Sequence, residues 1–83
     1  PAMTLDSARL RDPLVVTRIR DSAHAPDWAQ RLEELGFIPG EPVMLMAAGP
    51  FGGDPLVVRV GASTFALRRA EAACIEVDRP PCE

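Results

Sequence analysis

A helix that ends abruptly and turns into a strand is the feature that most constrains this chain. It lies in the stretch Arg31-Leu32-Glu33-Glu34-Leu35-Gly36-Phe37-Ile38-Pro39-Gly40. Trp28, Leu32 and Leu35 recur at i, i+4 and i+7, so they share one face of a helix. Gly36 follows them at the position where a left-handed residue ends a helix. Because Pro39-Gly40 excludes further helix, we expect the helix to end at Leu35 and a strand to follow.

Short stretches rich in β-branched residues surround this helix and indicate a mainly β domain. We expect strands at 14–20, 41–47, 56–60, 64–67 and 74–77, a helical turn at 68–73, and a helical or extended lead-in at 4–13. The helix starts either with Pro26 at its first position or with Asp27 as its N-cap. Nine prolines and six glycines imply many turns. The pattern predicts a small SH3-like, partly open β-barrel of about five strands with one α-helix.

Alternation within the strands predicts which side chains share a face. In strand 41–47, one face carries Val43, Leu45 and Ala47, and the other carries Met44 and Met46. In strand 56–60, the shared face carries Leu56, Val58 and Val60. The side chains of Met44, Met46, Leu35 and Phe37 either line an adaptable apolar groove or fill the core, and for Leu35 we expect the core.

We expect one domain over residues 4–78, with a cloning remnant and start methionine at 1–3 and a flexible tail at 79–83. No apolar run approaches the ~20 residues that cross a bilayer, so we expect no membrane insertion. Cys74 and Cys82 form no disulfide framework, which favours reduced thiols in the cytoplasm. The net charge of −3 argues against nucleic acid as a partner.

The single histidine limits the chemistry that the chain can perform. It excludes a multi-histidine metal site within one molecule, and Ser7 and Ser63 have no nearby base, so we expect no enzyme and no required cofactor. Asp21, His24 and Asp27 are spaced at i, i+3 and i+6, and these residue types can bind a divalent ion. We expect either a weak Fe²⁺ or Zn²⁺ site there, completed by a second molecule in a homodimer or metal-bridged contact, or an ordinary solvated loop.

Two further segments supply candidate partner contacts. Phe51 lies in the glycine- and proline-rich loop 48–55, where an exposed aromatic side chain could anchor a protein partner. Arg68 and Arg69, followed by Glu71, form either a solvated surface or an arginine finger with an orienting carboxylate. The candidate partner contacts are Phe37, Phe51, Arg68 and Arg69.

Three pieces of the sequence together resemble the ferrous iron transport protein A family, the FeoA domain. They are Arg-Leu-x-x-Leu-Gly-Phe-x-Pro-Gly at 31–40, Gly-Asp-Pro at 53–55 and Leu-Arg-Arg-x-Glu-Ala at 67–72. The resemblance covers most of the chain in the right order. It departs near the start, where the family usually has a leucine and then a glycine and this chain has Ala8 and Arg11.

The resemblance implies an SH3-like accessory module in the bacterial cytoplasm. Its partner would be a membrane ferrous iron transporter that carries a GTPase domain, on whose intracellular part the module docks. One alternative is a GTPase-activating factor that uses Arg68 or Arg69. Another is a metal-responsive regulatory module, because related domains resemble the SH3-like module of metal-dependent repressors.

Overall fold

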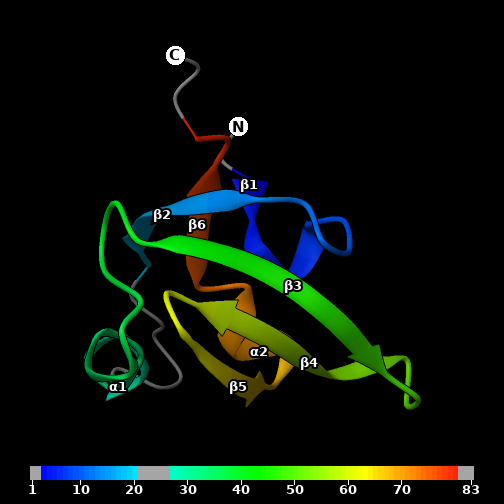
Figure 1. Cartoon of the computed structure of the whole chain (residues 1–83). Helices are drawn as coiled ribbons and strands as arrows, with labels where there is room; N and C mark the ends of the chain where they lie inside the picture. Colours follow the sequence, from blue (N-terminus) through cyan, green and yellow to red (C-terminus); the bar gives the residue numbers. More distant parts are fainter. Residues whose placement is uncertain (1–2, 21–26, 81–83) are drawn as a thin grey trace.

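A computed structural model describes residues 3–20 and 27–80 (Figure 1). Its elements are β1 (Met3–Thr4), the 3-10 turn η1 (Leu5–Ser7), β2 (Leu14–Ile19), α1 (Asp27–Leu35), β3 (Pro42–Gly49), β4 (Gly53–Val60), β5 (Ser63–Leu67), α2 (Arg69–Ala72) and β6 (Ile75–Asp78). The predicted helix and the five predicted strands are confirmed. Since the residues just before Asp27 lie outside the described part, the two predicted helix starts stay open.

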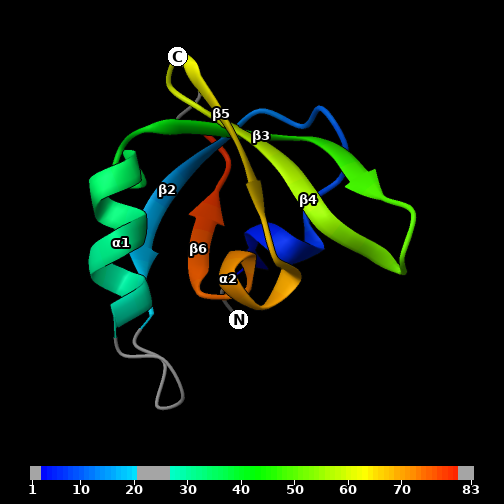
Figure 2. The ribbon, with the colours of Figure 1, turned by 90° about the horizontal axis from the view of Figure 1, so that it is seen from below.

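The six strands form one antiparallel sheet in the order β1-β6-β2-β3-β4-β5. The sheet curls without closing, which confirms the partly open, mainly β architecture (Figures 1 and 2). The prediction of about five strands missed β1, whose two residues pair with Val77 and Glu76 of β6. Two residues are too few to show a period-2 pattern, so only the partner strand reveals this one.

The end of α1 has the geometry that the sequence predicts. Gly36 has a φ of +117°, in the region that favours glycine. Its N–H donates to the Glu33 carbonyl at 3.0 Å, and the Phe37 N–H donates to the Leu32 carbonyl at 3.0 Å. These two bonds form a Schellman motif, which satisfies carbonyl groups that the helix end would leave unpaired.

The hydrophobic core includes Phe37, the last residue of this motif. Its buried apolar residues are Leu5, Leu14, Val16, Leu32, Phe37, Val43, Leu45, Leu56, Val58, Val60, Leu67, Ala72, Ile75 and Val77. Phe37 is 0% exposed, and its ring centroid lies 6.2 Å from that of Phe65. Leu56, Val58 and Val60 are all buried, which confirms the predicted inward face of β4.

The inward face of β3 is predicted correctly only for its first half. Val43 and Leu45 are buried, but Ala47 is exposed. The pairing register with β4 shifts between Leu45 and Ala47, which marks a bulge. Because an extra residue reverses the alternation of side chains, the prediction that Ala47 shares the face of Leu45 is wrong.

Arg11 is the only non-glycine residue with a positive φ, at 63°, among residues 3–20 and 27–80. Its N–H donates to the Leu45 carbonyl at 2.7 Å, which fixes this conformation against β3. The left-handed region costs a residue with a Cβ about 1 kcal/mol. This strain gives a physical reason for the glycine that the resemblance to the FeoA family leads us to expect here.

We therefore expect Arg11→Gly to stabilise the protein. Relief of strain of about 1 kcal/mol is partly offset by the greater unfolded-state freedom of glycine, so the melting temperature should rise by a few degrees. Differential scanning calorimetry measures this change. Arg9→Gly, two residues earlier on the exposed surface, serves as the control and should not raise the melting temperature. An unchanged or lower melting temperature for Arg11→Gly would contradict the assignment of strain.

Candidate functional site

A shallow depression brings together residues that are far apart in the sequence. It is lined by Phe51, Asp54, Pro55 and Arg68 and has a cavity volume of about 350 Å³. Phe51 lies at the tip between β3 and β4, and Arg68 directly follows β5 (Figure 1). Phe51 is 82% exposed, the highest value among the exposed large apolar side chains of the described chain. An exposed aromatic side chain and an arginine therefore flank one concave surface.

The tip of the β3–β4 hairpin is shaped by a tight backbone turn. The Asp54 N–H donates to the Phe51 carbonyl at 3.2 Å, and Gly49 pairs with Gly53 across the hairpin. Gly53 has a φ of +83°, and a Cβ there would lie 2.9 Å from a guanidinium nitrogen of Arg69. Glycine is therefore favoured at this position by its backbone conformation, and the guanidinium of Arg69 packs directly against it.

Arg69 ties this hairpin to the rest of the domain. Its backbone N–H donates to Asp54 Oδ1 at 3.0 Å. Its Nη2 donates to the Asp6 carbonyl at 3.4 Å, at the 3-10 turn η1. The guanidinium of Arg69 is thus engaged within the molecule. The side chain of Arg68, in contrast, is exposed and forms no ion pair with any other residue of the described ranges.

Glu71 has a structural role rather than the predicted role of orienting an arginine finger. Its carboxylate is buried, at 6% exposure, and Oε1 accepts a hydrogen bond of 2.9 Å from the backbone N–H of Arg68. The same side chain forms an ion pair with Arg31 of α1. Glu71 therefore fixes the backbone from which the Arg68 side chain extends, and it joins α2 to α1.

The position of Phe37 in the structure rules it out as a partner contact. Its side chain is fully buried in the core, so no partner reaches it without unfolding the region around it. Of the three other candidates, Phe51 and Arg68 line the depression, and Arg69 contacts it only through the hydrogen bond of its backbone N–H to Asp54. Asp54 and Pro55 also line the depression but were not predicted as site residues, although the Gly-Asp-Pro piece was the signal that could have identified them.

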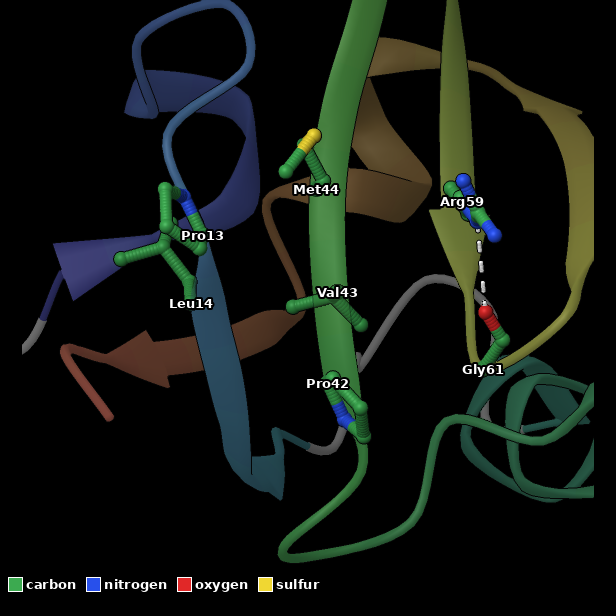
Figure 3. A pocket seen from close by; sticks show the side chains of 7 residues that line it. All are labelled: Pro13, Leu14, Pro42, Val43, Met44, Arg59 and Gly61. Carbon is green, nitrogen blue, oxygen red and sulfur yellow. Dashed lines mark hydrogen bonds between the residues drawn. The ribbon is translucent and has the colours of Figure 1, made fainter. Parts of the chain in front are cut away.

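A second, more apolar pocket lies where β2 and β3 begin (Figure 3). Its volume is about 230 Å³, and its lining residues are Pro13, Leu14, Pro42, Val43, Met44, Arg59 and Gly61. Arg59 Nε donates to the Gly61 carbonyl at 3.4 Å across one end of this pocket. Met44 is the only member of the predicted groove that lines it. Leu35 packs against the core, as predicted, and Phe37 belongs to that core.

The predicted metal site lies mostly outside the described part of the chain. Asp21 and His24 fall in that undescribed segment, and Asp27 is the exposed first residue of α1. Within residues 3–20 and 27–80, no group of three or more His, Cys, Asp or Glu side chains could hold a metal ion. The site at Asp21, His24 and Asp27 stays a prediction.

The thiol of Cys74 is free and half-buried, and Cys82 lies beyond the described residues. Burial raises the pKa of the Cys74 thiol above its usual value; the nearby Arg20 guanidinium opposes this shift and the Asp6 carboxylate adds to it. Cys74 Sγ donates to the Ala70 carbonyl at 3.5 Å. A thiol with a raised pKa is mostly protonated at neutral pH, so it is a poor nucleophile.

The two helices of the described chain, α1 and α2, are short. Neither α1 nor α2 is both long enough and apolar enough to span a bilayer.

Comparison with known proteins gives a consistent result. Residues 3–79 match the family model for the FeoA domain. The crystal structure of FeoA from Stenotrophomonas maltophilia in complex with zinc has 47% sequence identity and a TM-score of 0.84; the match covers 93% of this chain and 91% of that one. That protein is described as an SH3 domain protein and a candidate activating factor for bacterial ferrous iron transport. This match confirms the predicted SH3-like fold.

Two further solved structures extend the comparison. Iron(II) transport protein A from Clostridium thermocellum is 31% identical, with a TM-score of 0.77, and the match covers 93% of this chain and 45% of that chain. A manganese-dependent transcriptional repressor is 25% identical, with a TM-score of 0.79, over 96% of this chain and 42% of that chain. A comparison with curated protein sequences finds no match.

Proposed function

Because the chain belongs to the FeoA domain family and so has a role in ferrous iron transport, we propose that it docks on a membrane ferrous iron transporter. The docking surface is the depression formed by Phe51, Asp54, Pro55 and Arg68, and the target is the intracellular part of the transporter that carries its GTPase domain. The observation that carries this proposal is the juxtaposition of the exposed Phe51 ring with Arg68.

The chemistry of these two side chains supports protein contact. Aromatic and arginine side chains dominate the binding energy of protein interfaces, particularly when they flank a pocket that a partner can fill. Phe51 buries a large apolar area on contact, and Arg68 supplies a planar group with five N–H donors for a carboxylate or a carbonyl. Asp54 and Arg69 hold the surface in shape through their 3.0 Å hydrogen bond.

A second function is favoured by the exposure of Arg68 and by the description of the Stenotrophomonas maltophilia protein as a candidate activating factor. In this version, Arg68 enters the GTPase site of the transporter in trans and stabilises the charge that develops during phosphoryl transfer. Arginine fingers accelerate GTP hydrolysis by about 10³–10⁵-fold. Glu71 would then fix the backbone of the finger rather than its guanidinium.

We expect Phe51→Ala and Arg68→Ala each to weaken binding to the isolated GTPase-bearing part of the transporter by about 30-fold. This corresponds to about 2 kcal/mol, as is typical when an anchor residue is truncated. Titration calorimetry measures the affinity, and GTP turnover measured on the same samples separates the two functions. If Arg68→Ala binds at saturating concentration but no longer stimulates GTP turnover, Arg68 acts as an arginine finger. If Arg68→Ala at saturating concentration stimulates turnover as much as the unchanged protein, Arg68 contributes to docking alone.

Glu34→Ala provides the matched control, because Glu34 is exposed on α1 and does not line the depression. Its affinity should stay within about twofold of the unchanged protein, as expected for a residue outside an interface. Unchanged affinity in both Phe51→Ala and Arg68→Ala would exclude this surface as the docking site. A divalent ion at Asp21, His24 and Asp27 stays a separate prediction, supported by the zinc complex of the Stenotrophomonas maltophilia protein.

A further inference from the structure

One long edge of the sheet has no partner strand. The strand β5 ends the sheet opposite β1 and pairs with β4 alone (Figure 1). Its pairing with β4 is regular over five residue pairs, from Val60↔Ser63 to Leu56↔Leu67, with no bulge. It also contains no proline and no charged residue. Natural sheets usually protect an edge strand with a bulge, a proline or a charged residue. An edge that has none of them can pair with another strand.

The hairpin register shows which backbone groups of β5 are free. Val60 and Ser63 flank the two-residue turn Gly61-Ala62, so they form a hydrogen-bonded pair. Hydrogen-bonded and open pairs alternate along an antiparallel ladder. Thr64 and Ala66 therefore direct their N–H and C=O groups away from β4, and both residues are exposed. Outside the ladder, no backbone hydrogen bond among the described residues involves Thr64 or Ala66.

The charged residues nearest this edge are mainly arginines, although Asp54 lines the adjoining depression. Arg59 of β4 lies opposite Thr64 in the ladder and is exposed, and Arg68 directly follows β5. No acidic residue occurs from Gly61 to Ala70. The carboxylate of Glu41 lies near the turn, beside Gly61, at the end of the strand away from Arg68. A segment with acidic residues would therefore find a complementary surface along β5.

We propose that β5 binds an extended acidic segment of the transporter as an additional strand of the sheet, which then leads into the depression at Phe51 and Arg68. This inference rests on the proposed docking function and assigns the form of the bound segment. Strand addition obtains its affinity from main-chain hydrogen bonds and its specificity from an adjoining pocket. The free groups of Thr64 and Ala66 supply the hydrogen bonds, and the depression supplies the pocket.

A second copy of this chain fits the edge less well. Pairing β5 with its own copy would bring two pairs of guanidinium groups, from Arg59 and Arg68, to one interface. The exposed outer face of β5 carries only the small side chains of Thr64 and Ala66, so such a contact would bury little apolar area.

The test compares two substitutions at one position. Ala66→Pro removes the outward N–H, and proline is tolerated on the free side of an edge strand. Ala66→Val adds similar bulk and keeps the N–H. We expect Ala66→Pro to weaken binding to the isolated GTPase-bearing part by about tenfold and Ala66→Val to change it less than about twofold. Amide hydrogen exchange at Thr64 and Ala66 of the unchanged protein should slow on binding, and this measurement decides the question if Ala66→Pro fails to fold.

The other outcomes overturn the inference in distinguishable ways. If binding persists and depends on Phe51, but the amides of Thr64 and Ala66 stay unprotected, docking stands and strand addition is wrong. If the unchanged protein does not bind at all, the proposed function fails first. Self-association in sedimentation equilibrium that Ala66→Pro abolishes, without any effect on partner binding, would make a second copy the occupant of the edge.

Discussion

Replacing Phe37 with alanine is expected to reduce the free energy of unfolding by about 3–5 kcal/mol. The ring is 0% exposed and packs against Phe65 in the middle of the core, so its removal leaves a large cavity that the surrounding strands fill only partly. Small domains have only about 5–10 kcal/mol in total. Chemical denaturation monitored by circular dichroism should therefore show a much lower midpoint, or an unfolded protein at room temperature.

Ile38→Ala, at the next residue, provides the control for Phe37→Ala. The Ile38 side chain is 43% exposed, so its truncation should cost about 1 kcal/mol or less. A Phe37→Ala protein as stable as the Ile38→Ala protein would mean that the ring is not part of the core. Phe37 would then return as a candidate partner contact, and the conformation of the chain after α1 would have to be different.

We expect Gly36→Val to destabilise the protein by about 1–3 kcal/mol, through backbone strain. The φ of Gly36 is +117°, which a β-branched residue rarely adopts. Space is not the cause, because a Cβ at this position would lie 3.9 Å from Val60 Cγ1, an ordinary contact. Thermal unfolding should show a melting temperature lower by several degrees for each kcal/mol.

Glu34→Ala separates this strain from any general effect of substitution near the helix end. Glu34 is exposed in the last turn of α1, and alanine is the best helix former, so stability should change by less than about 0.5 kcal/mol. If Gly36→Val melts at the same temperature as the unchanged protein, the two hydrogen bonds of the Schellman motif do not require a positive φ at this residue.

Local patterns in the sequence predicted those elements whose signals lie within a few residues. The i, i+4, i+7 spacing of Trp28, Leu32 and Leu35 followed by Gly36 predicted α1 and its end, because helix geometry and helix termination are both local. The alternation from Leu56 to Val60 predicted the buried face of β4 for the same reason. The strand β1 and the bulge at Ala47 could not be predicted, since each depends on pairing with a strand distant in the sequence.

The candidate site was predicted as separate residues rather than as a surface. Phe51 was identified from its glycine-rich loop and Arg68 from its charge, but their meeting around one depression depends on how the β3–β4 hairpin lies against the start of α2. For Glu71 the sequence left a solvated surface and an orienting carboxylate as alternatives, and neither describes its buried position. Its spacing from Arg68 suggested a side-chain pair, whereas its carboxylate binds the Arg68 backbone and Arg31, 40 positions earlier in the chain.

The buried carboxylate of Glu71 connects the helix α1 to the depression, although no residue of α1 lines it. One side chain joins Arg31 of α1 to the backbone of Arg68, so a shift of α1 along the sheet would displace the residue that borders the depression. A substitution at Arg31 can therefore change the position of Arg68 although α1 does not line the depression. In the opposite direction, any force on the backbone of Arg68 is transmitted through Glu71 to Arg31 of α1.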